Sequence, residues 1–228
     1  MAYPFTHLCV ASIMLQSLHF TEDAEQQFLL GSIAPDAVHY RTGLVGASKL
    51  DIGPIKKTSH LCPVSSERWG QVTDNDGWIR CIKTWLKTHP PTDAFFAGYA
   101  THCLTDLYNN LTLWKTYSTT HPEDAALGYN AIYYDDLKKI DARLFFEFEN
   151  SQDILTKLAQ AKPVGIMINE KEALVTQQEV HDIMQNIAYE HFKNVQKPDE
   201  HYTYIHYDDV IQYIHDAALF CMKHITNF

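Results

Sequence analysis

Hydrophobic side chains recur with helical spacing wherever the pattern along this chain is clear. The clearest example is one face of a predicted helix, in which apolar residues are spaced i, i+1, i+4, i+7 and i+8. These residues are Trp78, Ile79, Ile82, Trp85 and Leu86. No run of residues shows the sustained alternation of a β-strand. The pattern therefore predicts an all-α protein.

Further helices follow from local start signals. One is expected from about Asp93 to Trp114 after a proline, another from Pro122 to about Glu149, and one behind the capping-box pattern Thr176–Glu179. A last helix carries Val210 to Cys221 and the C-terminus. Together with helices near 5–18 and 22–33, these predict a compact bundle of at least seven helices, and the length favours one domain over 1–228.

Three segments fit the helical pattern poorly. Residues 40–63, which contain Gly43, Gly46, Gly53 and Pro54, and residues 196–205 are expected to be loops. The short apolar segment 163–169 is compatible with a buried turn or with an extended piece.

Acidic residues outnumber basic ones, 28 to 18, which gives a formal charge of −10. This charge opposes binding to nucleic acid or to anionic membranes. An anionic substrate would need a local positive centre, and a bound divalent cation is often the largest charge in its site.

The cysteines and the N-terminus indicate an intracellular protein. Five scattered cysteines, with no CxxC pair, are expected to be reduced and mostly buried: Cys9, Cys62, Cys81, Cys103 and Cys221. The first 20 residues lack a basic leader and a clean cleavage site, and no run of about 18 apolar residues occurs. We expect no signal peptide, no membrane span and a cytoplasmic location.

His102 and Asp106 stand out among the chemically active side chains. They lie four residues apart in a strongly apolar helix, so they share one face with Cβ atoms roughly 5–6 Å apart. An imidazole and a carboxylate so placed can bind one metal ion. A buried hydrogen bond between the two is the alternative.

Three other residues are unremarkable when taken singly. Asp36 follows a proline at the expected end of a helix, His60 comes from the segment KKTSH, and His7 lies in the first helix. Separately, they are compatible with a turn and with two surface histidines.

Together these segments resemble the zinc-dependent phospholipase C family of bacteria, which is related to the fungal single-strand zinc nucleases. The resemblance covers about residues 1–145 and includes the early histidine, "GSIAPD", "K..SH" and "GY.TH...D". It implies a phospholipase C or zinc nuclease-like helical fold. It also implies that Asp36, His60, His102 and Asp106 surround one zinc, and that Asp106 bridges to a second zinc held by His7.

The chain also departs from this family. It starts at Met1, whereas the secreted members free an N-terminal tryptophan that completes one zinc site. The later histidine and HxxxE pair of the family are missing, so we expect one or two zinc ions, or another divalent metal, and fewer than three. Asp135 and Asp136 are expected on a solvated face. The roles of Asp141, His39 and His121 stay open.

The expected function is that of a phosphoric ester hydrolase in which metal-activated water attacks phosphorus. Asp36 is a metal ligand and a candidate general base. By elimination the substrate is a small soluble phosphoester, because no basic track for nucleic acid and no amphipathic basic helix is present. The oligomeric state is left open.

Two alternatives compete with this function. An HD-type phosphohydrolase would use the dipeptide His181-Asp182 or His215-Asp216. A non-catalytic protein would use the metal only to hold its fold together.

Overall fold

The structure confirms an all-α bundle. The computed structural model describes residues 3–44, 49–63, 72–170 and 172–225, and within them the chain forms eleven α-helices, ten of which have seven or more residues. The α-helices are Pro4–Leu15 (α1), Glu22–Gly31 (α2), Lys49–Ser59 (α3), Asn75–Leu86 (α4), Ala94–Leu111 (α5), Leu113–Thr120 (α6), Pro122–Ala125 (α7), Ile132–Glu147 (α8), Ser151–Gln160 (α9), Gln177–Gln185 (α10) and Tyr207–Ile225 (α11).

Shorter elements connect these helices. They are the 3-10 helices Ala34–Tyr40 (η1) and Gly128–Asn130 (η2), the π-helical turn Asn186–Glu190 (η3), and the strands Ile166–Met167 (β1) and Ala173–Val175 (β2). The two strands pair antiparallel, so the apolar segment 163–169 contains an extended piece.

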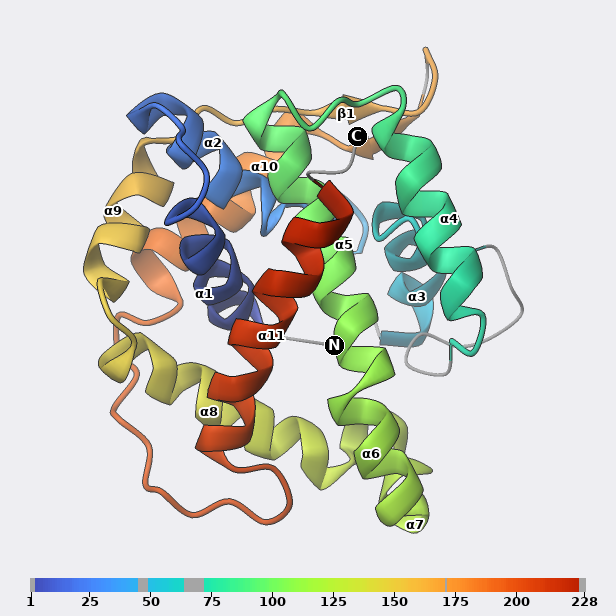
Figure 1. Ribbon diagram of the computed structural model, residues 1–228, viewed down its shortest axis with the longest axis vertical. Coiled ribbons are helices and arrows are strands. Elements are labelled where there is room, and N and C mark those ends of the chain that lie inside the picture. Colours follow the sequence, from blue (N-terminus) through green and yellow to red (C-terminus); the bar gives the residue numbers. More distant parts are fainter. Residues whose placement is uncertain (1–2, 45–48, 64–71, 171, 226–228) are drawn as a thin grey trace.

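Helix α5 runs through the middle of the bundle (Figure 1). It packs against α2, α4 and α11, while α1 packs against α11 and α8. Most side chains of α5 are buried, as expected of a helix that is apolar on all sides. Polar groups on this helix, including His102 and Asp106, therefore lie deep inside the protein.

Two glycines allow α2 and α5 to touch backbone to backbone. A Cβ atom on Gly31 would overlap the carbonyl oxygen of Phe95, and a Cβ atom on Gly98 would overlap that of Phe28. This close contact sets the end of α2, and the η1 turn that follows it, against the middle of α5. It is the packing that brings Asp36 toward His102.

The sequence-based interpretation is wrong for part of the 40–63 segment. Residues 49–59 form α3 with Pro54 inside it, although a proline in a helix interior costs about 3 kcal/mol relative to alanine. Tertiary contacts of α3 with η1 override this local preference. Residues 45–48, with Gly46, lie outside the described residues, whereas segment 196–205 is non-helical as expected.

Several helix boundaries differ from those predicted from the sequence. The helix expected over 93–114 ends at Leu111, because Thr112 leaves helical geometry, and α6 begins directly after it. The helix expected over 122–149 is divided into α7 and α8 by a turn in which Gly128 adopts a φ of +59°. Helix α9 was not predicted. The capped helix α10 and the C-terminal α11 are confirmed, and residues 226–228 lie outside the described residues.

Asp136 does not face solvent, although the sequence predicts a solvated face for both Asp135 and Asp136. Its side chain is buried and accepts hydrogen bonds from the backbone N–H groups of Thr203, Tyr204 and Ile205. The carboxylate thereby orders the segment before α11. Asp135 is exposed, as expected.

The cysteines agree with the expectation of reduced, mostly buried thiols. Four are buried, Cys81 is partly buried, and none of the five forms a disulfide. Across the described ranges, no helix is both long and apolar enough to cross a lipid bilayer.

Candidate metal centre

Four elements bring the five predicted ligands together at the middle of α5. His7 lies in the first turn of α1, Asp36 in η1, and His60 directly after α3, while α5 supplies His102 and Asp106. Their ligand atoms form two groups that share His102, namely His7, His102 and Asp106, and Asp36, His60 and His102. Within each group the ligand atoms lie within 4.8 Å of one another, so each group could hold a metal ion.

The orientations of His60 and His102 are fixed by backbone carbonyls. His102 Nδ1 lies 2.7 Å from the carbonyl oxygen of Ser32, and His60 Nδ1 lies 2.8 Å from that of Lys56. A carbonyl oxygen only accepts, so Nδ1 carries the proton in both rings. In the neutral imidazoles the lone pair is then on Nε2, so this atom can bind a metal ion while the other ring nitrogen donates to the backbone.

The two Nε2 atoms face each other at 3.1 Å. Burial lowers the pKa of His60, and burial together with the neighbouring His7 lowers the pKa of His102 well below its ordinary value. Both rings are therefore neutral at physiological pH. Two facing lone pairs repel each other, and a shared cation turns this repulsion into attraction, so the donor set fits a metal ion.

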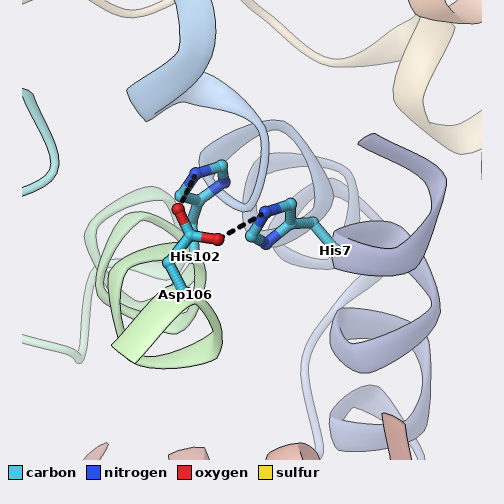
Figure 2. Close-up of side chains that lie close together, drawn as sticks. All are labelled: His7, His102 and Asp106. Atoms are coloured by element: carbon cyan, nitrogen blue, oxygen red, sulfur yellow. Dashed lines mark ion pairs between the residues drawn. The ribbon is translucent and has the colours of Figure 1, made fainter. Parts of the chain in front are cut away.

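Asp106 faces both groups with its two oxygens. Oδ1 lies 3.5 Å from His7 Nε2, while Oδ2 lies 3.6 Å from His60 Nε2 and 3.9 Å from His102 Nε2. Figure 2 shows one oxygen of the Asp106 carboxylate directed at the His7 ring and the other at the His102 ring. Burial alone would raise the pKa of Asp106, but these two imidazoles hold it below its usual value. An ionised carboxylate with this placement can bridge two ions.

His7 is the least satisfied polar group of the centre. Its ring is stacked on that of His102, with centroids 3.7 Å apart and an angle of 7° between the planes. The side chain is buried, and within the described part of the chain neither ring nitrogen makes a hydrogen bond. Buried polar groups are normally hydrogen-bonded, so this ring also fits a ligand role.

Asp36 lies at the more open edge of the centre. Its Oδ1 lies 2.5 Å from Lys56 Nζ, 3.4 Å from His60 Nε2 and 3.7 Å from His39 Nε2. Burial alone would raise the pKa of Asp36, but Lys56, His60 and His102 hold it well below its usual range. Asp36 is therefore an ionised carboxylate.

Sequence reasoning did not identify the groups that support His60. Tyr99 donates a hydrogen bond to the carbonyl oxygen of Ser59, and Trp78 Nε1 donates to that of His60. Lys56 is the lysine of the motif "K..SH", and the sequence pattern alone predicts no role for it. Its position one helical turn before His60 was the available signal, because side chains at i and i+4 lie on one face.

Asp141 caps α1 and belongs to neither ligand group of the described residues. It accepts hydrogen bonds from the backbone N–H groups of Phe5 and Thr6 and from the Thr6 hydroxyl, so both of its oxygens are engaged. Helix α1 has no side-chain cap of its own, and the two N–H groups belong to its first turn. Burial raises the pKa of Asp141 to about 6, although these hydrogen bonds lower it. The cap fixes the turn that carries His7.

We expect Asp141→Ala to lower the free energy of unfolding by about 2 kcal/mol, because it leaves two helix N–H groups without their acceptor. Urea denaturation followed by circular dichroism measures the change. Asp135→Ala is the control, because Asp135 lies at an exposed position of α8, the helix that also carries Asp141. Its free energy of unfolding should stay within about 0.5 kcal/mol of that of the wild type. Equal losses in the two variants would contradict the capping role.

Three other histidines, His121, His181 and His215, belong to neither ligand group of the described residues. His121 is stacked on Tyr204, with ring centroids 4.1 Å apart. His181 and His215 are exposed on α10 and α11, and the neighbouring Asp182 and Asp216 accept hydrogen bonds from Gln178 and Gln212 of their own helices.

Comparisons of the chain with protein-family models, with curated proteins and with solved structures find no match. A function for this centre is therefore inferred from its geometry and from the sequence motifs.

Proposed function

We propose that the five residues bind one or two zinc ions and that this centre hydrolyses small phosphoesters. The observation that carries the proposal is the pair of neutral, backbone-oriented imidazoles of His60 and His102, whose Nε2 atoms face each other at 3.1 Å beside an ionised carboxylate. This donor set of nitrogen and carboxylate oxygen is typical of zinc.

Two further features support hydrolysis rather than a purely structural metal. Asp106 faces both ligand groups with its two oxygens, and a carboxylate in this position can bridge the ions of a centre that clamps a phosphoester between two metals. A bound zinc ion supplies Lewis acidity and makes water a stronger nucleophile at neutral pH. The resemblance of residues 1–145 to the zinc-dependent phospholipase C family points to the same reaction class.

Each of the five residues has a proposed role in the centre. His60, His102 and Asp106 are proposed as ligands, and His7 joins Asp106 on the side of α1. Asp36 is proposed as a ligand at the open edge. Its low pKa suits this role better than that of general base, because an efficient base has a pKa near the working pH.

The HD-type alternative receives less support. Each of its His-Asp dipeptides places the histidine on an exposed helical face, and neither dipeptide belongs to a potential metal group of the described residues. A structural metal without catalysis is the second candidate, and the same experiment separates it from the enzyme.

Elemental analysis of the purified protein, dialysed against a weak chelator, should find one or two equivalents of zinc. Three equivalents are not expected, because Asp141 is occupied as a helix cap and the later ligands of the family are missing. The zinc-loaded protein should hydrolyse p-nitrophenyl phosphate or bis(p-nitrophenyl) phosphate. Strong chelation should stop the reaction, and added zinc should restore it.

Other outcomes of this experiment are equally clear. A protein that binds no divalent metal contradicts the whole proposal. A protein that retains zinc, hydrolyses neither ester and unfolds on chelation contains a structural metal. Retention of three equivalents means that ligands beyond the five residues exist.

A further inference from the structure

A residue with left-handed backbone geometry follows His60 directly. Leu61 has a φ of +53°, a conformation that glycine adopts easily and that other residues adopt rarely. Its N–H donates to the carbonyl oxygen of Thr58 at 3.0 Å. The next N–H, of Cys62, donates to the carbonyl oxygen of Lys57 at 2.9 Å, which completes a Schellman motif at the end of α3. His60 lies between the helix and this turn, so the direction of its side chain depends on how firmly the turn is held.

Two buried aromatic side chains bond to the two backbone carbonyls at this helix end. The Tyr99 hydroxyl, from α5, donates to the carbonyl oxygen of Ser59 at 2.5 Å. Trp78 Nε1, from α4, donates to the carbonyl oxygen of His60 at 2.8 Å. The last carbonyls of a helix have no partner inside it, and buried ones need a donor from elsewhere. Both aromatic residues are at most 2% exposed, so they hold the turn from inside the core.

Tyr99 also connects His60 to His102. Tyr99 and His102 are three residues apart on α5, a spacing that places them on one side of the helix. Tyr99 bonds to the backbone just before His60, and His102 faces the His60 ring, with the Nε2 atoms 3.1 Å apart. The Tyr99 ring is itself stacked on Trp85, with centroids 5.1 Å apart. Helix α5 therefore holds both the backbone and the side chain of His60 relative to His102.

We propose that Tyr99 is a positioning residue of the metal centre. Its hydroxyl, together with Trp78 Nε1, sets how closely His60 and His102 face each other, and thereby the affinity for the ion. Tyr99 belongs to neither ligand group of the described residues, so it acts through the backbone of Ser59 and His60. This assignment gives a role to the tyrosine of the motif "GY.TH...D". It rests on the proposed metal centre.

Tyr99→Phe tests this role because it removes only the hydroxyl group. We expect the variant to keep the helical content of the wild type and to bind zinc at least about tenfold more weakly, as is typical when a group that orients a ligand is lost. Zinc affinity is measured by competition with a chromophoric chelator in the absence of denaturant. Nearly all molecules are then folded, so a loss of global stability alone does not change the affinity. Urea denaturation of the zinc-free proteins gives the stability separately.

Tyr213→Phe is the matched control. The Tyr213 hydroxyl is also buried, and it donates to the carbonyl oxygen of Thr105 at 2.7 Å, so the same kind of bond is lost. Thr105 lies inside α5, where regular helical geometry holds the following Asp106 in place. We expect Tyr213→Phe to lose stability much as Tyr99→Phe does, and to bind zinc as tightly as the wild type.

Trp78→Phe provides a second test through the other carbonyl. It keeps an aromatic ring in the core but loses the N–H group that donates to the carbonyl oxygen of His60. Zinc binding should weaken in the same direction as in Tyr99→Phe. This variant also decides the question if Tyr99→Phe does not fold.

Several results would overturn the positioning role. One is wild-type zinc affinity in Tyr99→Phe, or in Trp78→Phe where that variant replaces it. Another is an equal loss of affinity in Tyr99→Phe and Tyr213→Phe, because any hydrogen bond of the core would then have the same effect. Failure of the proposed function is read from the wild type. Absence of zinc binding contradicts the metal centre itself, whereas zinc binding without hydrolysis contradicts only the enzyme and leaves the positioning role intact.

Discussion

Replacing His102 with alanine is expected to abolish zinc binding and metal-dependent phosphoester hydrolysis while the helical content stays close to that of the wild type. His102 belongs to both ligand groups, so its loss removes a ligand whichever of the two groups holds the ion. Its Nε2 also lies 3.1 Å from the Nε2 of His60. Elemental analysis, circular dichroism and the nitrophenyl ester assays measure the three properties.

His181→Ala is the matched control for this prediction. His181 lies on α10 with its side chain exposed, and replacement of such a residue usually changes stability by no more than about 0.5 kcal/mol. It should keep both zinc and activity. An HD-type enzyme built on His181 and Asp182 would give the reverse result. Loss of zinc together with unfolding in His102→Ala would indicate a structural metal.

The sequence predicted the core of the candidate centre because the relevant information was local. His102 and Asp106 share a face through the periodicity of a single helix, and the observed separation of 3.9 Å between His102 Nε2 and Asp106 Oδ2 follows from it. The capping box of α10 was predictable for the same reason, since Thr176 and Glu179 bond to each other's backbone.

Interactions between distant segments and the backbone were not predictable in this way. The carbonyl oxygen of Ser32 orients His102 across 70 positions, and a backbone carbonyl leaves no mark on the amino-acid pattern. Asp141 and Asp136 look like ordinary helical acids, yet each binds backbone N–H groups of a segment more than 60 positions away. Their burial depends on how α8 packs, which helical periodicity alone does not specify.

At α3 the local sequence predicts the wrong structure, because tertiary contacts outweigh the loop preference of its residues. Gly53 and Pro54 both favour a loop, so their intrinsic propensities do not predict a helix here. Contacts of α3 with η1 hold the helix in place, and its last turn carries Lys56 and presents His60 to the centre. Packing energy can outweigh one unfavourable residue because propensity is a weak determinant.

Gly98→Ala is expected to destabilise the protein by at least about 3 kcal/mol, at the upper end of the range for overpacked cores. The added methyl group would overlap the carbonyl oxygen of Phe28 and lie 3.0 Å from the backbone nitrogen of Ser32. Both neighbours are backbone atoms, so they cannot move aside by changing a rotamer. Relief requires α2 and α5 to separate, and thermal unfolding should show a fall in Tm of about 10 °C.

The same separation should weaken the metal centre, because the carbonyl oxygen of Ser32 orients His102 and lies at the point of contact. Zinc affinity of Gly98→Ala should therefore fall together with stability. Gly53→Ala is the matched control: no described atom lies within 4 Å of its added Cβ, and alanine is preferred over glycine in a helix by about 1 kcal/mol. Gly53→Ala should be as stable as the wild type or more stable. Wild-type stability and zinc affinity in Gly98→Ala would show that α2 and α5 do not pack through their backbones, and the placement of Asp36 beside His102 would lose its structural basis.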